Sequence, residues 1–161
     1  MDTEGTLAPA TPAEAREEYD TLVPAAKVAV REAAKAMEFD REEYAERVTG
    51  EVIETVRDAL FASLLAVHVG TREEYEAWLD DHPEYESDMA GSENVDNVVW
   101  HPVAFAPESA GGSMDDGPKP VIAATWQAER EAALGTLRRR AFGRAYRPVV
   151  DDVRDDEAGE P

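Results

Sequence analysis

Three histidines are the side chains of this sequence that are best suited to metal binding or proton transfer near neutral pH: His68, His82 and His101. No two of them have the close spacing with which one helix presents two ligands to a metal ion. His68 and His101 would meet across a sheet if both lay on strands, and Glu93 or Asp96 would then complete a site of two histidines and one carboxylate. The alternative is that both histidines are partly buried and hydrogen-bonded, while His82 stands at a helix end.

A polar run, Ser-Glu-Asn-Val-Asp-Asn, occupies residues 92–97 directly before an apolar stretch. An enzyme or ligand-binding domain would place its site at this run. The candidate ligand-site residues are Glu93, Asp96, Trp100, His101 and His68. The competing interpretation is that the run only turns the chain, because Asn and Asp are common turn residues. The sequence has no glycine-rich phosphate loop and no Gly-x-Ser-x-Gly elbow. We predict no metal and no cofactor, and the catalytic residues, if any, stay unknown.

One segment, residues 127–147, is basic: it holds six Arg and two Glu. Some of these arginines fall on one helix face, which is a candidate face for binding an anion or a partner. Its residues are Arg138, Arg140, Arg144 and Arg147. Arginines beside aromatic rings can bind phosphate and stack on RNA bases, so RNA association is one hypothesis. We favour the other, in which they pair with the acidic block at residues 51–90, with a second subunit or with an acidic tail.

Composition limits the classes of function. The chain of 161 residues has 36 Asp and Glu against 16 Lys and Arg, a net charge of −20 that would repel nucleic acid overall. Hydrophobic residues make up 43%, in periodic blocks, unlike an acidic disordered chain. The bases are thirteen Arg and three Lys, and excess acid with little Lys is typical of proteins folded in strong salt, where charge repulsion is screened. We interpret this as halophilic adaptation; an ordinary acidic protein from a GC-rich genome is the alternative.

The location follows from what the sequence lacks. It has no cysteine, hence no disulfide and no thiolate metal site. No run of about 18 apolar residues is present, so we expect no membrane span. The first ten residues have neither the basic start nor the apolar stretch of a signal peptide. We expect a cytoplasmic protein without a membrane partner.

Periodicity and capping signals predict an α+β fold: N-terminal helices, a small antiparallel sheet and a long C-terminal helix. The N-terminal half starts with a flexible tail at residues 1–10. A helix begins at Thr11, Pro24 either ends it or opens a second one, and Asp40 caps a third. Gly50 either interrupts this third helix, or the helix continues into residues 51–66, the expected central core helix.

In the second half of the chain, the spacing of apolar residues changes from that of helices to that of strands. Residues 67–69 are either a last helical turn or a short strand, which we favour, and Thr71 opens a capping-box helix to Asp81. Pro102 would place its strand at an edge or a bulge. The strands are expected at 84–90, 98–105 and 121–126, a flexible loop at 106–120, the last helix at 127–146, and an acidic tail at 149–161. Residues 11–148 would form a single domain.

Four stretches resemble an uncharacterised family of small acidic proteins from halophilic archaea, a domain of unknown function. They are VGTREEY at 69–75, GSENVDNVVWH at 91–101, TWQAEREAA at 125–133 and LRRRAFGRAY at 137–146. The resemblance covers about residues 5–148 and implies a cytoplasmic, salt-adapted protein, but no activity, cofactor or functional residue.

We therefore expect a non-catalytic protein-interaction module that contacts another protein or its own copy, as a homodimer, through the C-terminal helix and the strands within residues 98–126. A small enzyme or ligand- or metal-binding domain with a site near residues 92–101 is the alternative. RNA association through the Arg-rich helix comes third, and nucleic acid is the less expected partner.

Overall fold

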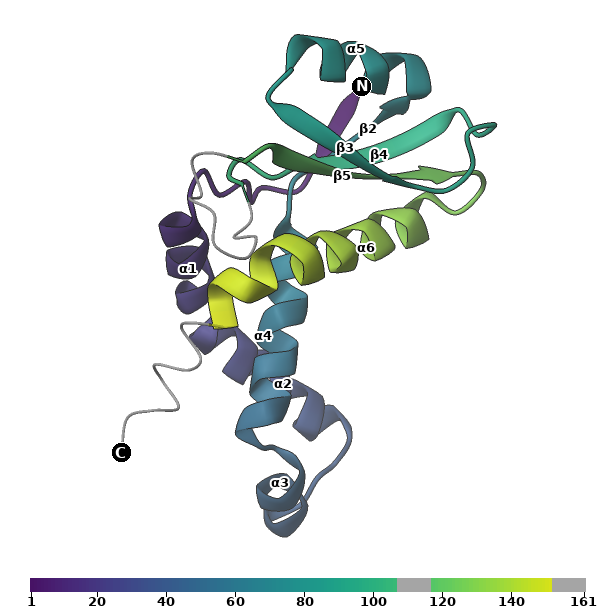
Figure 1. Cartoon of the computed structure of the whole chain (residues 1–161). Helices are drawn as coiled ribbons and strands as arrows, with labels where there is room; N and C mark the ends of the chain where they lie inside the picture. The colour runs from purple at the N-terminus through teal and green to yellow at the C-terminus, as the bar shows by residue number, and fades with distance from the viewer. Residues whose placement is uncertain (107–116, 152–161) are drawn as a thin grey trace.

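The computed structural model describes residues 1–106 and 117–151 (Figure 1), and its architecture is the α+β fold that the sequence predicts. Helices dominate the first part of the chain, and strands then alternate with two further helices. The elements are β1 (Asp2–Glu4), α1 (Pro12–Thr21), α2 (Val23–Ala36), α3 (Arg41–Arg47), α4 (Gly50–Leu64), β2 (Val67–Thr71), α5 (Arg72–Asp81), β3 (Tyr85–Ala90), β4 (Asn97–Pro102), β5 (Lys119–Trp126), α6 (Arg130–Ala141) and a π-helical turn η1 (Phe142–Tyr146).

Side-chain caps determine where the N-terminal helices begin. Thr11 accepts a hydrogen bond from the backbone N–H of Glu14, and Asp40 caps α3 in the same way. Thr49 caps α4, so Gly50 is the first residue of that helix and not an interruption within a longer one. The capping box predicted at Thr71 is present, with both of its hydrogen bonds.

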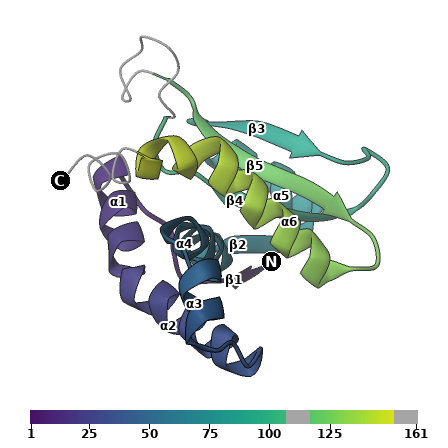
Figure 2. The ribbon, with the colours of Figure 1, turned by 90° about the horizontal axis from the view of Figure 1, so that it is seen from below.

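A five-stranded sheet with the order β1-β2-β4-β5-β3 forms the body of the molecule. Its neighbours pair antiparallel, except for β3, which pairs parallel with β5. The residues at 67–69 belong to β2, as we favoured. Helix α5 covers one face of the sheet, and α6 lies across the other (Figures 1 and 2). Because side chains alternate along a strand, β4 sends Val98 and Trp100 to one face and Val99 and His101 to the other.

Each face of the sheet has its own apolar core. On the α5 side, Tyr75, Trp100 and Val121 form a buried cluster with Trp78 packed against it. On the α6 side, a larger cluster joins the sheet to α1, α4 and α6. Its largest members include Tyr19, Phe61, Leu134, Leu137 and Tyr146. Helix α4 therefore takes part in the body core only through its C-terminal half.

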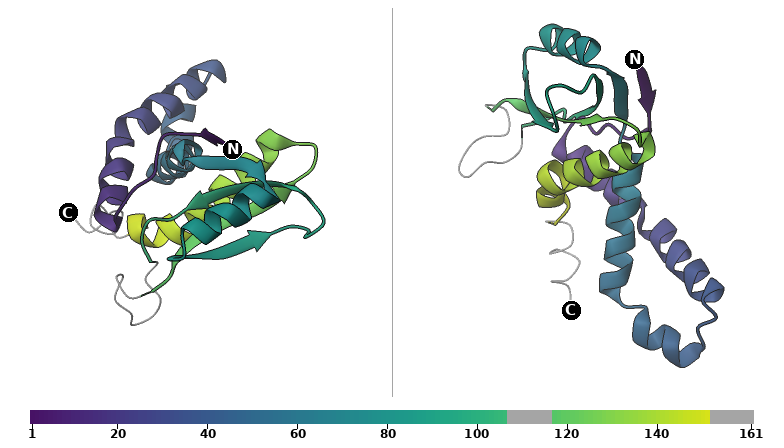
Figure 3. Two further views of the ribbon diagram at one scale, coloured as in Figure 1. Left: turned by 90° about the horizontal axis from the view of Figure 1, so that it is seen from above. Right: turned by 90° about the vertical axis from the view of Figure 1, so that its right-hand side faces the viewer.

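The remaining helices project from the body as an arm (Figures 1 and 3). We define the helical arm as residues 23–56: α2, α3 and the N-terminal half of α4. Helices α2 and α4 pack side by side, and α3 lies at the far end, away from the sheet. On α2 only Ala26, Val30 and Ala34 are buried, and α3 has no buried residue. The arm therefore has a thin core of small side chains.

Two predictions about the ends of the domain are wrong. Residues 1–10 are not simply a tail, because β1 pairs with β2 at the sheet edge and Leu7 is buried against the core. The acidic tail does not begin at residue 149, since helical backbone continues through residue 151 and Val149 and Val150 are buried. Both ends carry apolar side chains that cover the α6 side of the core, a signal that charge patterning obscured.

Two predictions within the sheet also need correction. Pro102 does not mark an edge strand, because β4 lies between β2 and β5. Proline is tolerated there because it is the last residue of the strand, paired with Val121 of β5 but past the end of the pairing with β2. The sheet is also not wholly antiparallel, since β3 runs parallel to β5. In the loop expected at 106–120, β5 already starts at Lys119, and residues 107–116 lie outside the described residues.

Candidate functional site

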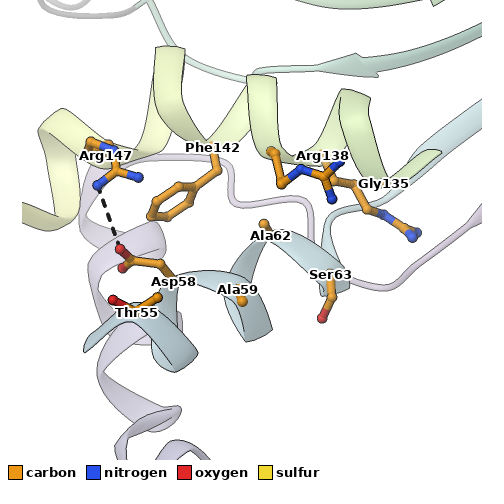
Figure 4. A pocket seen from close by; sticks show the side chains of 10 residues that line it. Thr55, Asp58, Ala59, Ala62, Ser63, Gly135, Arg138, Phe142 and Arg147 are labelled. Carbon is orange, nitrogen blue, oxygen red and sulfur yellow. Dashed lines mark ion pairs between the residues drawn. The ribbon is translucent and has the colours of Figure 1, made fainter. Parts of the chain in front are cut away.

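A cleft of about 470 Å³ lies between α4 and α6, where the arm meets the body (Figure 4). We call it the α4–α6 cleft. Its volume is within the range of about 300–1,000 Å³ that small-molecule and peptide anchor pockets occupy. The lining residues are Thr55, Asp58, Ala59, Ala62, Ser63, Gly135, Arg138, Arg139, Phe142 and Arg147. The cleft thus combines an apolar middle with charged ends.

The floor of the cleft is apolar and rigid. The ring of Phe142 is 3% exposed and packs edge-on against Phe61, with ring centroids 5.7 Å apart. Opposite it, α4 presents Ala59 and Ala62, and α6 presents Gly135. Small residues at facing positions leave space between the helices, since larger side chains would fill it. The cleft therefore exists because of residue size and not because a loop is open.

At one end of the cleft, two arginines carry charge that no described carboxylate pairs with. Arg138 is held by backbone oxygens: its Nε donates to the carbonyl of Leu65 at 3.0 Å and its Nη2 to that of Glu4 at 3.3 Å. Arg139 donates only to the hydroxyl of Thr136, at 3.3 Å. Carbonyl groups orient a guanidinium without neutralising it, so this end is an electropositive rim.

The other end of the cleft is closer to neutral. Arg147 Nη1 lies 3.7 Å from Asp58 Oδ2, and its guanidinium carbon lies 5.1 Å from the ring centroid of Phe142. Asp58 also accepts a hydrogen bond of 2.6 Å from the Tyr19 hydroxyl. The carboxylate is thus already engaged by two partners, which makes it a weak candidate for a general base.

The predicted arginine face is divided by the structure. Arg140 and Arg144 both bind Asp88 of β3, at 2.5 Å and 2.7 Å, and Arg140 also donates to the carbonyl of Ala123. Arg138 and Arg147 instead line the cleft. Arg138 is two residues from Arg140 within α6, which places it about 200° around the helix. The π-helical turn η1 lies between Arg140 and Arg147 and changes the helical period, so Arg147 no longer shares the face of Arg140 and Arg144. Asp58 and Asp88 both belong to the acidic block at 51–90 that we expected to pair with these arginines.

The two histidines of the hypothetical metal site lie on opposite faces of the sheet. His68 is paired in register with Trp100, so both point to the α5 side, where their ring centroids are 5.5 Å apart. His101, one residue further along β4, points to the α6 side. The prediction that they meet is therefore wrong. Within residues 1–106 and 117–151, no group of three His, Asp or Glu side chains is arranged to hold a metal ion.

His101 is buried and fully hydrogen-bonded. Its Nδ1 donates to the carbonyl of Ala66 at 2.5 Å, which leaves Nε2 to accept from the hydroxyl of Tyr146 at 2.6 Å. Burial lowers the pKa of His101 to about 4, and it raises the pKa of Tyr146. A neutral imidazole therefore joins β4 to the π-helical turn. This is the hydrogen-bonded role that the sequence offered as the alternative, but His101 is fully rather than partly buried.

The polar run at 92–97 turns the chain and assembles no site with the histidines. Glu93 and Asp96 are exposed, whereas Trp100 and His101 are fully buried on opposite faces of β4. Arg72 holds the run in place, because its guanidinium donates to the carbonyls of Ser92 and Val95. Turn chemistry is therefore the role that the contacts support, and His82 stands at the helix end expected for it, as the C-cap of α5.

Sequence reasoning found the arginines but missed the cleft that two of them border. The missing information is which helix faces α6, and nothing local in the sequence specifies that α4 does. Two signals were available: the small residues Ala59 and Ala62 in the middle of a core helix, and Gly135 within α6. A glycine inside a helix costs about 1 kcal/mol, so its presence indicates a packing or functional reason.

Comparison with known proteins gives a family and no characterised relative. The model of DUF5809, a family of unknown function, matches residues 6–147. No curated protein and no solved structure matches the chain. No helix in the described part of the chain is long and apolar enough to span a membrane.

Proposed function

The chain belongs to DUF5809, and from that premise we propose that it is a non-catalytic protein-interaction module whose α4–α6 cleft binds an acidic, partly apolar segment of another protein. The carrying observation is the pair Arg138 and Arg139 beside an apolar floor, both without a described carboxylate partner, in a chain of net charge −20. Other described cations, such as Lys27 and Arg31, also lack an ion pair, but Arg138 and Arg139 lie at the rim of a cleft with an apolar floor. That combination marks the place where a partner's carboxylates fit.

An acidic protein segment suits the cleft better than RNA does. The floor is apolar, which favours aliphatic or aromatic side chains over a sugar–phosphate chain. The overall charge of −20 repels a polyanion, whereas a segment with two or three carboxylates meets only the local rim. Arg140 and Arg144, which an RNA surface would need, are occupied by Asp88.

The absence of catalysis in this proposal rests on the state of the reactive groups. Asp58 is the one carboxylate among the cleft-lining residues, and Arg147 and Tyr19 engage it. His101 is enclosed in the core with both ring nitrogens used. A residue that performs acid–base chemistry needs access to a substrate, and neither group offers it.

We also propose that the module works in the salt-filled cytoplasm of a halophile. The support is compositional: 36 acidic residues, three Lys and a net charge of −20. At about 1 M salt the Debye length is about 3 Å, so long-range repulsion is removed while contacts within the cleft persist. The unfolding midpoint should rise steeply with KCl concentration; an equal midpoint in dilute buffer and in concentrated KCl would contradict this part of the proposal.

Binding is tested with a matched pair of labelled helical peptides. Both carry the same leucines, and one has Glu where the other has Gln. Fluorescence anisotropy should show that the Glu peptide binds at least about tenfold more tightly, because only its carboxylates match Arg138 and Arg139. Equal binding, no binding by either peptide, or tighter competing binding by an oligouridine would overturn the proposal.

Variants locate the binding in the cleft. Arg139→Glu reverses a rim charge whose one described contact is Thr136, and Ala59→Leu fills the floor. Each should weaken the Glu peptide by about tenfold or more. The matched control is Arg41→Glu, which makes the same charge change at an exposed position on α3, outside the cleft. Its affinity should stay within about twofold of the wild type.

A further inference from the structure

The helical arm has an incomplete apolar core and exposed apolar side chains. Of the six large hydrophobic residues that are exposed in the described part of the chain, four lie on the arm: Val28 (51% exposed), Met37 (64%), Tyr44 (37%) and Val52 (39%). The residues of α2 that are buried are Ala26, Val30 and Ala34. Isolated helices of about 12–15 residues are marginal in water, so a projecting pair needs more burial than this.

The two long helices of the arm carry opposite charge. Helix α2 has three basic residues and one acidic residue, and it holds two of the three lysines of the chain. Helix α4 has three acidic residues and one basic residue. A net positive helix is unexpected in a chain of net charge −20, because solubility in salt would be served better by acids.

The arm carries two pairs of like charges, one on α2 and one on α4. Lys27 and Arg31 are four residues apart on α2, and Glu51 and Glu54 are three apart on α4, so each pair lies on one helix face. Lys27 and Glu54 line a hollow of about 360 Å³ between the two helices. The helices connect through α3 and run in opposite directions, which places Arg31 and Glu51 one turn further toward the tip. Within the described chain, neither Lys27 nor Arg31 forms an ion pair with Glu51 or Glu54.

From these observations we propose that the arm binds the arm of a second copy of this chain, face to face, to form a four-helix bundle. A two-fold axis along the arm brings both tips to the same end and lays α2 of each copy over α4 of the other. Lys27 then faces Glu54 of the partner subunit, and Arg31 faces Glu51 of the partner subunit. A surface with one positive and one negative wall is complementary to its own rotated copy, which is the condition for a two-fold interface.

This inference does not rest on the α4–α6 cleft, and the two can fail separately. The bundle uses the α2 side of α4, whereas the cleft is bordered by the residues of α4 that face α6. Arg139→Glu should therefore weaken acidic peptide binding by about tenfold or more and leave self-association unchanged.

Charge exchange tests the bundle. The full chain should be a dimer by sedimentation equilibrium in KCl solution. The double variants Lys27→Glu with Arg31→Glu, and Glu51→Lys with Glu54→Lys, should each raise the dimer dissociation constant at least about 100-fold, because four facing pairs per dimer become like-charged. Circular dichroism should show unchanged helix content in both.

The decisive result is the mixture of the two double variants. One has acidic walls only and the other basic walls only, so together they should form a heterodimer with one copy of each, while each alone stays monomeric. A wild-type chain that is monomeric at every concentration would overturn the proposal. So would double variants that dimerise like the wild type, or a mixture that stays monomeric. If the wild type is monomeric yet binds a different protein through the arm, the second-copy assignment is also wrong.

Discussion

The sheet body and the helical arm differ in how completely each covers its own side chains. The body buries Trp100, Tyr19, Tyr146 and Phe61 almost entirely and uses both ring nitrogens of His101. The arm buries three small side chains on α2, none on α3, and leaves Val28 and Met37 more than half exposed. A region that buries its own apolar side chains is stable without a partner, whereas a region that leaves them exposed indicates where a partner binds. Substitutions should therefore act on unfolding in the body and on association in the arm.

The largest loss of stability is expected from Trp100→Ala. Trp100 is fully buried on the α5 side among Tyr75, Trp78 and His68, so truncation leaves a large cavity and should cost about 4 kcal/mol of unfolding free energy. Trp100→Phe should cost much less, because it also removes an indole N–H that has no hydrogen-bond partner. Guanidinium unfolding in KCl solution measures both. A cost below about 1 kcal/mol for the alanine variant would mean that the α5 side is not a core.

The next largest effect is a pH dependence from His101. Its pKa is lowered from 6.5 to about 4 by burial, so between these values the unfolded chain binds more protons than the folded one. Stability should be complete above pH 6.5 and fall as the pH drops toward 4, by about 3 kcal/mol in total. His101→Gln should remove most of this slope in unfolding experiments across pH. Part will remain, because the pKa of the half-buried His68 is also lowered by burial.

A smaller loss is expected at the turn between β3 and β4. Gly91 has a φ of +111°, and a Cβ there would lie 2.0 Å from the hydroxyl oxygen of Thr125. Gly91→Ala should cost about 2 kcal/mol through backbone strain and this overlap. Gly143→Ala is the matched control, since a Cβ at that position meets nothing within 4 Å. Equal melting temperatures for the two variants would contradict the assigned turn geometry.

The smallest effect on unfolding is expected from the arm. Val28→Ser changes a side chain that is 51% exposed, so the unfolding free energy of the monomer should change by less than about 0.5 kcal/mol. Its dimer dissociation constant should nevertheless rise, because the side chain lies on the uncovered part of α2. Sedimentation and chemical unfolding on one preparation separate the two quantities. A large loss of unfolding free energy without a change in the dimer dissociation constant would contradict the difference between body and arm.

Local signals in the sequence predicted the elements well and their meeting points poorly. Thr11, Asp40 and Thr71 cap helices as expected, because a cap depends on residues three positions apart. The hypothesis that His68 and His101 share one site was wrong, because the two side chains lie on opposite faces of the sheet. His68 pairs with Trp100, and a shift of one residue in that register would have brought His101 to the same face. Strand register is set by the packing of both sheet faces, which a single sequence does not reveal.

The cleft was not predicted, and the arginine face was predicted only in part, for a related reason. Pairing of the arginines within residues 127–147 with the acidic block followed from charge alone, and their contacts with Asp58 and Asp88 support it. The separation of Arg147 from Arg140 and Arg144 did not follow, because it depends on the π-helical turn within an otherwise regular helix. The separation of Arg138 from Arg140 is ordinary α-helical spacing. Likewise, Ala59 and Gly135 become neighbours only through the packing of α4 on α6.

The π-helical turn also determines which way the side chains after it face. Its extra residue per turn is what lets Val149 and Val150 reach the core after Arg144 has bound Asp88 outside it. If the helix returned to its regular pitch with every residue kept, its last residues would rotate by about 100° and the two valines would turn toward water. Deleting one residue of the turn, such as Gly143, where an added Cβ would meet nothing within 4 Å, would cancel that rotation and keep both valines on the core.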